Sequence, residues 1–220
     1  MPIINVEQGS EAWKVLRRTK ITSTMASVIT GCNPFKSRLQ LYYELTGVSD
    51  PDEPNAAMRL GTDLEPIARK EYIRQVGFEV EPIVYQSDTL PWALCSYDGY
   101  NSYLNRAVEI KAGKKAYELS VKGIIPDYYK CQMSFAMMVK NLGSMDYFTY
   151  WEGKTILMQY DRDEAYIEAI QRECERFYSD LKTLTPPTID PFEDIGISDA
   201  EWNERTNQTW NNALKGDKNA

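Results

Sequence analysis

Residues 92–112, WALCSYDGYNSYLNRAVEIKA, are the stretch that decides the fold of this chain. An aromatic-rich run is followed by turn-forming residues at 101–105 and then by a short run that contains Val and Ile, which is typical of a β-hairpin. If the turn centres on Tyr103 and Leu104, Asp98 lies directly opposite Glu109. The sequence therefore predicts two antiparallel strands that carry facing carboxylates.

These carboxylates are candidate metal ligands. Directly opposed side chains leave one face of a sheet with β-carbons about 5 Å apart, so Asp98 and Glu109 could hold one cation. Lys111 shares the face of Glu109, about 7 Å along the strand. Two carboxylates and an amine suit Mg²⁺ chemistry on a phosphate group, with Mn²⁺ as an alternative. A solvated strand face of mixed charge is the other interpretation, but the apolar surroundings favour a functional site.

The composition is that of an ordinary globular protein. The 220 residues are 43% hydrophobic and 26% charged, which is enough for one domain with a sizeable core. No apolar run is as long as a membrane span and the first residues lack a signal-peptide pattern, so we expect a cytoplasmic protein. The four cysteines are dispersed without a CxxC motif, which favours reduced thiols over disulfides or zinc.

The complete absence of histidine narrows the chemistry. It excludes Ser-His-Asp and Cys-His catalysis, zinc bound by histidine and histidine-dependent nucleases. A general acid or base must then be Asp, Glu, Lys, Tyr or water. Chemistry by carboxylates and a metal ion remains.

Charge is distributed unevenly along the chain, whose net charge is −7. No acid lies between Glu11 and Glu44, and residues 183–204 carry acids without a base. A focused basic groove on an acidic protein can still hold a phosphate backbone, although ordinary surface charge explains the same pattern. The bases of the first segment are Lys14, Arg17, Arg18, Lys20, Lys36 and Arg38.

Periodicity and capping residues predict an α/β or α+β fold with a central mixed β-sheet flanked by helices. We expect one domain over residues 1–185 and a partly disordered acidic extension over 186–220. The helix over 55–76 should kink or restart at Glu65–Pro66, because proline removes a helical hydrogen bond. The methionines of the helix over 127–141 are expected in the core. Other helices are predicted at 11–18, 24–30, 37–45 and 163–184, and strands at 78–85, 92–100, 106–112, 145–151 and 154–160.

Several motifs resemble one nuclease family. An Asp on one strand followed by E-x-K on the next resembles the core of the PD-(D/E)xK superfamily. EQGSEAWKVLRRTKITST (residues 7–24) and GTDLEPIARKEY (residues 61–72) resemble the opening and the G-x-x-x-E helix of lambda-exonuclease-like, or YqaJ-type, viral recombination nucleases. Gln132, in YKCQMSFA, falls where that family has a glutamine on the following helix. The matches occur in the family's order over roughly residues 7–160.

The resemblance implies roles for the core residues. Asp98 and Glu109 would be metal ligands together with the carbonyl of Ile110. Lys111 would orient or deprotonate the attacking water, and the sequence leaves this choice open. Glu65 would complete the acidic cluster. Gln132 would hold the active-site network or the scissile phosphate.

Three further residues correspond to the family's DNA-end contacts. Arg17 matches the arginine of its LR motif, which is similar to a pocket residue for a 5′-terminal phosphate, and a guanidinium suits that dianion. Thr24 corresponds to a serine beside this pocket, at the start of a helix. Met58 corresponds to an apolar residue that wedges the duplex end.

The resemblance implies a Mg²⁺-dependent 5′→3′ exonuclease that degrades linear double-stranded DNA and leaves 3′ single strands for a single-strand annealing partner. It also implies a phage or bacterial-host setting and a homotrimeric ring. The alternatives are a PD-(D/E)xK endonuclease or repair nuclease, and a non-catalytic DNA-binding recombination accessory. Because like charge repels phosphate, the acidic extension with Trp202 is expected to face away from the DNA, as a subunit contact, as a docking surface for the annealing protein, or as a solvated tail.

Overall fold

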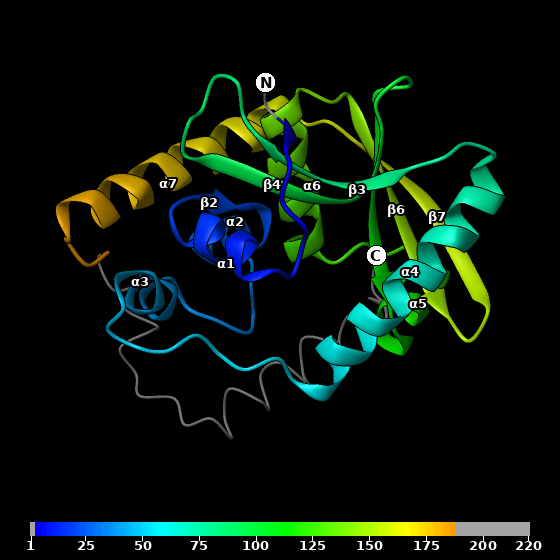
Figure 1. The fold of residues 1–220 in the computed structure, drawn as a ribbon, viewed down its shortest axis with the longest axis horizontal. Coiled ribbons are helices and arrows are strands. Elements are labelled where there is room, and N and C mark those ends of the chain that lie inside the picture. The colour runs from blue at the N-terminus through cyan, green and yellow to red at the C-terminus, as the bar shows by residue number, and fades with distance from the viewer. Residues whose placement is uncertain (1–2, 188–220) are drawn as a thin grey trace, which may run out of the picture.

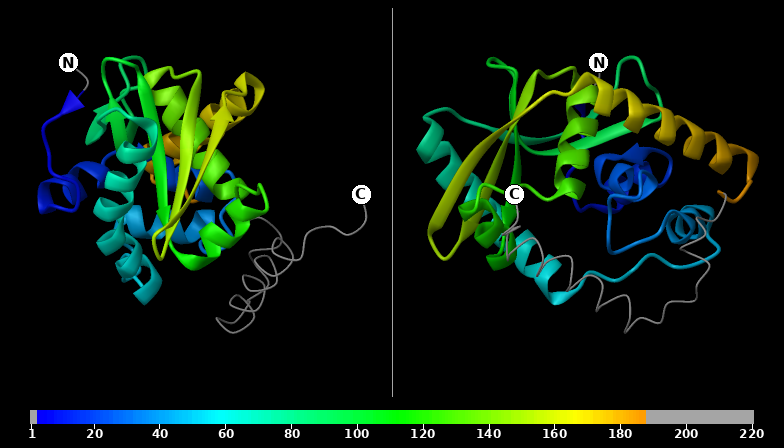
Figure 2. Two further views of the ribbon diagram at one scale, coloured as in Figure 1. Left: turned by 90° about the vertical axis from the view of Figure 1, so that its right-hand side faces the viewer. Right: turned by 180° about the vertical axis from the view of Figure 1, so that it is seen from behind.

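The computed structural model describes residues 3–187, which form a mixed β-sheet with helices on both faces (Figures 1 and 2). Within this range the strand order is β1-β3-β4-β5-β6-β7, and β2 pairs with β4. Pairing is antiparallel except for β2 with β4 and β5 with β6. The predicted α/β class with a mixed sheet is confirmed. The strands are Ile3–Ile4 (β1), Ile21–Thr22 (β2), Glu81–Gln86 (β3), Ala93–Asn101 (β4), Arg106–Ala112 (β5), Ser144–Trp151 (β6) and Lys154–Asp161 (β7).

All six predicted helices are present, and the structure adds a seventh, α5, that the sequence did not suggest. Their caps follow the sequence. The Ser10 hydroxyl accepts a hydrogen bond from the Trp13 amide, Ser37 forms a capping box with Gln40, and Gly47 ends a helix with φ 76°. The helices are Glu11–Arg18 (α1), Ser23–Ile29 (α2), Arg38–Thr46 (α3), Ala56–Val76 (α4), Lys114–Val121 (α5), Asp127–Lys140 (α6) and Glu164–Thr183 (α7).

Helix α4 continues through Pro66, so a restart of the helix, one of the two predicted outcomes, is wrong. Proline removes one backbone hydrogen bond, to the carbonyl of Thr62, but leaves the rest of the helix able to form. Within the two turns that follow it, Ala68 and Tyr72 are fully buried in the same core cluster as Phe148 of the sheet. This tertiary packing stabilises the second half of the helix.

The core has two parts, one on each face of the sheet. The smaller lies under α4, and the larger lies under α2, α6 and α7 on the opposite face (Figure 2). Met133 and Met137 of α6 are fully buried in the larger part, and Met138 packs against it, which confirms their predicted place in the core. All four cysteines are free thiols, as predicted.

A buried carboxylate ties α4 to the sheet. Asp146 of β6 is 4% exposed, and the Arg106 guanidinium donates to both of its oxygens, at 2.9 and 2.7 Å. The Tyr72 hydroxyl of α4 donates to Oδ2 of the same carboxylate at 2.5 Å. Burial and this hydrogen bond raise the pKa of Tyr72 above its usual range. Every charge of this network is therefore compensated inside the fold.

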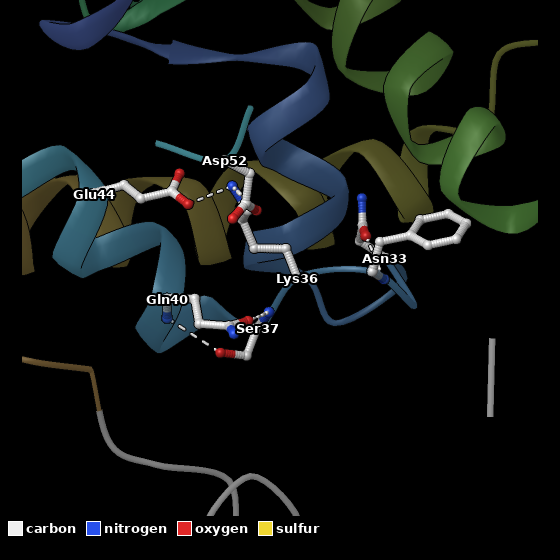
Figure 3. Close-up of polar contacts among 7 residues, drawn as sticks. Asn33, Lys36, Ser37, Gln40, Glu44 and Asp52 are labelled. Atoms are coloured by element: carbon white, nitrogen blue, oxygen red, sulfur yellow. Dashed lines mark hydrogen bonds and ion pairs between the residues drawn. The ribbon is translucent and has the colours of Figure 1, made fainter. Parts of the chain in front are cut away.

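Ion pairs also hold the loops around α3 (Figure 3). The Lys36 ammonium contacts Glu44 at 2.5 Å and Asp52 at 3.0 Å, which joins the loops before and after α3. Figure 3 also shows the Ser37–Gln40 capping contacts at the start of that helix. The predicted basic segment is thus partly neutralised by acids outside it. The other pairs of this kind are Lys14 with Glu11, at its edge, and Arg38 with Glu173.

Most of the predicted acidic extension, including Trp202, lies outside the described residues. In the part of the chain that the structure describes, no helix is long and apolar enough to cross a membrane.

Candidate active site

The β4–β5 hairpin has the predicted register. Gly99 pairs with Val108 and Tyr100 pairs with Ala107, which sets Asp98 opposite Glu109. Backbone pairing ends at Gly99, and the Asp98 side chain takes its place, because Oδ2 accepts a hydrogen bond from the Ile110 amide at 2.8 Å. The Asp98 carboxylate therefore lies between the two strands, beside the backbone of its predicted fellow ligand.

Gly99 allows this close approach. A β-carbon at this position would lie 2.7 Å from Val80 and 2.8 Å from Val108, closer than side-chain atoms can pack. Only glycine fits between these two valines without a shift of the strands.

Glu109 and Lys111 lie on one face of β5, as the strand period predicts. Their side chains form an ion pair of 2.6 Å, and Glu109 is only 7% exposed. The Lys111 ammonium also lies over the Tyr129 ring of α6, 4.8 Å from its centroid. Burial lowers the pKa of Lys111, but Glu109 and the other acids outweigh this and raise it overall. Without a metal ion, Lys111 is therefore a charged ammonium.

Helix α4 brings a third carboxylate to the cluster. Glu65 pairs with Arg69 one turn later, and the Arg69 Nε donates to the backbone carbonyl of Asp98 at 2.6 Å. Burial, and then Glu109, raise the pKa of Asp98 well above its usual range. Burial also raises the pKa of Glu65, against the opposing effect of Arg69. The fold therefore places Glu65, Asp98 and Glu109 close together, although their negative charges repel one another.

The donor set fits a hard divalent cation. Residues 3–187 contain no group of three or more His, Cys, Asp or Glu side chains arranged to hold a metal ion. Asp98, Glu109 and the Ile110 carbonyl nevertheless offer oxygen ligands from two carboxylates and the backbone. Mg²⁺ is commonly bound in this way, through one or two carboxylates while it keeps several waters. A cation there would also offset the repulsion between Asp98 and Glu109.

Gln132 and Thr24 contact each other across two helices. The Gln132 Nε2 of α6 donates to the Thr24 hydroxyl at the start of α2, at 3.2 Å. Gln132 is 8% exposed, whereas Thr24 is exposed to solvent. Gln132 also lies three residues after Tyr129 on α6, hence on the same helix face. The structure thus links Thr24 to the helix that contacts Lys111.

Arg17 lies near the same cluster. Its guanidinium stacks over the Trp13 ring, 4.3 Å from the centroid, and the Trp13 indole donates to Ser96 of β4 at 2.9 Å. Burial lowers the pKa of Arg17, and the thiol of Cys95 is the neighbour that acts against this. The same thiol interacts electrostatically with Glu109 and Asp98. Among the described residues no carboxylate pairs with Arg17.

Met58 is not brought into the cluster. It is 59% exposed in the first turn of α4, where its amide donates to Asn55. It precedes Glu65 by two helical turns, or about 10 Å. An exposed methionine at this distance lies at the rim of the site rather than in it.

The sequence analysis missed two residues of this cluster. Tyr129 supports the Lys111 ammonium, and Arg69 links Glu65 to the Asp98 backbone. Helical spacing could have suggested Arg69, because it follows Glu65 by four residues. The contact of Tyr129 with Lys111 joins α6 to β5 and has no local signal in the sequence.

Comparison with known proteins supports the family resemblance that the sequence motifs indicate. The family model described as "YqaJ-like viral recombinase domain" matches residues 12–143. An alkaline exonuclease from Laribacter hongkongensis, LHK-Exo, is 23% identical with a TM-score of 0.69, over 91% of this chain and 99% of that chain. Its complex with dAMP gives 24% identity and a TM-score of 0.68, over 80% of this chain and 94% of that chain. A phage-related exonuclease from Haemophilus somnus is 12% identical with a TM-score of 0.58. The match covers 75% of this chain and 96% of that chain. No curated protein sequence matches.

Proposed function

Because this chain belongs to the YqaJ-like viral recombinase domain family, we propose that it is a nuclease that acts on DNA. The observation that carries the proposal is the cluster of Asp98, Glu109 and Lys111 on one hairpin, with Glu65 beside it. These are the residue types that hydrolysis of a phosphodiester with a metal ion requires. The names of the similar structures, which describe exonucleases, support the same reading.

The proposed cofactor is Mg²⁺, with Mn²⁺ as an alternative, held by Asp98, Glu109 and the Ile110 carbonyl. When bound, the cation supplies Lewis-acid activation of the phosphoryl group and of water. The charged Lys111 then orients the attacking water and offsets the negative charge that develops on the phosphate. Glu65 accepts a hydrogen bond from water at the same site.

The proposed specificity is for 5′ ends of linear duplex DNA. Arg17 is a partly buried guanidinium that no described carboxylate pairs with, so it remains available for a terminal phosphate. The Thr24 hydroxyl, held by Gln132, adds a donor at the start of α2. Met58, exposed at the rim, is the proposed wedge that separates the two strands. Degradation from 5′ to 3′ would leave a 3′ single strand.

The proposed assembly is a homotrimeric ring that hands the 3′ strand to a single-strand annealing protein. A ring would keep the enzyme on its substrate through many cycles. This part of the proposal comes from the family resemblance, and solution mass with and without duplex DNA tests it directly.

Digestion of end-labelled DNA tests the proposed activity. Linear duplexes labelled at either end, each with a 5′ phosphate or a 5′ hydroxyl, are incubated with the full chain in Mg²⁺ or EDTA. We expect metal-dependent release of nucleotides from 5′-phosphorylated ends. Asp98→Asn should abolish release, and Asp63→Asn, which removes an exposed acid from α4, should not. Nicking of closed circles would support an endonuclease instead, and no release from any substrate would support a non-catalytic accessory.

A further inference from the structure

A groove lies where the ends of α1, α3 and α7 meet, and none of the residues that line it belongs to the candidate active site. Two adjoining hollows of about 350 and 290 Å³ form it, and Arg18, Leu45 and Thr46 line both of them. Figure 1 shows the end of α7 close to α3 in this region. We call the larger hollow, which also reaches Tyr178 and Leu184, the α7 groove. Its volume is sufficient for a few side chains of a peptide.

The charges that line the α7 groove are all positive. Arg18, Lys20 and Lys182 line it, and among the described residues no Asp or Glu does. The Lys20 ammonium donates to the Pro91 carbonyl at 2.6 Å. The Lys182 ammonium lies over the Tyr178 ring, 4.7 Å from its centroid. Within residues 3–187 none of these three cations forms an ion pair, so the groove favours a ligand that carries negative charge.

The smaller hollow is less suited to an anion. Glu44 and Asp50 line it besides Arg18, whereas Lys20 and Lys182 line only the larger one. An acidic ligand is therefore directed to the α7 groove.

Apolar side chains line the α7 groove together with these cations. Leu45 of α3 and Tyr178 and Leu181 of α7 are half-buried there. Leu184, at the end of α7, is 72% exposed, more than any other leucine among the described residues. A peptide with both acids and apolar side chains would cover these apolar groups as well as meet the cations. A DNA backbone would meet the cations alone, so the groove favours a peptide.

The described chain ends beside this groove. Leu184 ends α7 with φ 52°, and the Thr185 amide donates back to the Asp180 carbonyl at 2.9 Å, so the chain turns away from the helix axis. Pro187, the last described residue, is buried. It lies three residues after Leu184, and three residues span at most about 10 Å. The residues that follow Pro187 therefore begin within reach of the groove.

The sequence that follows is complementary to the groove. Residues 188–197, TIDPFEDIGI, contain three acids and no base, together with Phe192 and three isoleucines. Three negative charges thus match the three cations, and apolar side chains match the leucines. Because the segment is tethered a few residues from the groove, its effective concentration there is in the millimolar range, about that of a short flexible linker. Contacts that would be weak between separate molecules are then sufficient for docking.

We propose that residues 188–197 dock in the α7 groove of their own chain. Asp190, Glu193 and Asp194 pair with the cations of the groove, and Phe192 lies against its leucines. Ion pairs at an exposed surface contribute little individually and are screened by salt. Burial of the Phe192 ring therefore carries most of the binding, and the charges set the orientation of the segment. The groove is thus a site for an acidic, apolar peptide that the chain itself supplies.

Amide hydrogen exchange of the full chain, followed by mass spectrometry, tests the proposal. Residues 188–197 should exchange about tenfold more slowly than the same residues in a synthetic peptide, which corresponds to docking about 90% of the time. Phe192→Ala and Lys182→Glu should each raise the rate toward that of the synthetic peptide. Adding Glu193→Lys to Lys182→Glu should restore slow exchange, because the ion pair is rebuilt with its charges reversed. Lys122→Glu, which reverses an exposed charge at the end of α5, should behave as wild type.

Cross-linking shows which copy of the chain supplies the segment. A carbodiimide joins carboxylates to amines, and it is applied to a mixture of unlabelled chains and chains labelled with heavy nitrogen. Links from Lys20 or Lys182 to Asp190 or Glu193 should join residues of the same isotope only. Links between different isotopes would overturn docking within one chain.

The exchange rates also contain outcomes that would refute the proposal. Wild-type residues 188–197 that exchange as fast as the synthetic peptide would show that the segment is not docked. Slow exchange that Lys182→Glu leaves unchanged would show that the segment binds elsewhere. If that variant instead weakens the binding of duplex DNA, the groove holds a phosphate backbone and the proposal is wrong.

Discussion

The carboxylate cluster leads to a prediction about stability as well as activity. Asp98→Asn should make the metal-free protein more stable at neutral pH. The Asn side chain keeps an oxygen that can accept the hydrogen bond from the Ile110 amide, so this 2.8 Å contact survives. What disappears is a buried negative charge beside Glu109 and Glu65. The substitution therefore removes repulsion without creating a cavity.

The direction follows from proton linkage. Burial and Glu109 raise the pKa of Asp98 in the folded protein above its unfolded value of about 3.9. The folded state then binds the proton more tightly than the unfolded chain does. Stability from this group is present at low pH and is lost as pH rises through the interval up to the raised folded pKa. Above that interval the ionised Asp98 costs stability, and Asn removes the cost.

The magnitude is limited by Lys111, whose positive charge partly compensates Asp98. We expect a gain of about 0.5–2 kcal/mol, the range typical of single stabilising substitutions. For a domain of this size each kcal/mol raises Tm by about 2–4 °C. The gain should shrink as pH falls from the raised folded pKa of Asp98 toward its unfolded value of about 3.9, because wild-type Asp98 becomes protonated in the folded protein first.

The assay is thermal unfolding in EDTA and then in Mg²⁺. In EDTA the Asn variant should melt above wild type, while Asp63→Asn, which removes one exposed negative charge from α4, should change Tm little. Excess Mg²⁺ should stabilise wild type, by about 2.7 kcal/mol at a hundredfold excess over Kd, and should leave the Asn variant unchanged. An Asn variant that melts below wild type in EDTA, or that gains as much from Mg²⁺ as wild type, would refute the reasoning.

Three further predictions concern the surroundings of the cluster. Arg17→Ala should lose the preference for 5′-phosphorylated over 5′-hydroxyl ends in initiation assays, whereas Arg18→Ala, its exposed neighbour, should keep it; equal losses on both ends would place the phosphate pocket elsewhere. Tyr129→Leu should lower kcat about tenfold with little change in KM, because the ring no longer holds the Lys111 ammonium, and Tyr129→Phe should retain activity; equal loss in both would refute a role for the ring. Pro66→Ala should stabilise the protein by about 2 kcal/mol in chemical denaturation, since it restores a helical amide; a loss of stability would show that the ring is needed where it is.

Local patterns predicted the part of the site that is local. The register of Asp98 against Glu109 depends on one short turn and on strand alternation, both of which are visible in the sequence. The position of Lys111 beside Glu109 follows from the same alternation. The helix caps at Ser10 and Ser37 could also be predicted from the sequence, because a cap involves residues only three positions apart.

What the sequence could not provide depends on contacts between distant segments. The Tyr129 ring contacts Lys111 only because β5 and α6 pack together. Arg38 forms an ion pair with Glu173, which lies 135 residues away in the sequence. The course of α4 through Pro66 was mispredicted for the same reason, since burial of Tyr72 outweighs a local helix breaker. Helix α5 was missed because its mixed polar sequence lacks a clear apolar period.

Asp146 and Asp98 show two ways in which one sheet can treat an aspartate. Asp146 accepts hydrogen bonds from Arg106 and Tyr72, and the Arg106 guanidinium compensates its negative charge. Asp98 accepts one hydrogen bond, from the Ile110 amide, and lies near the carboxylates of Glu109 and Glu65. Its negative charge is therefore locally frustrated, unlike that of Asp146. Such frustration is kept where a sequence is selected for something other than stability. Within a single protein, the contrast distinguishes an aspartate whose charge is compensated by hydrogen bonds from Arg106 and Tyr72 from one whose negative charge lies beside other acids.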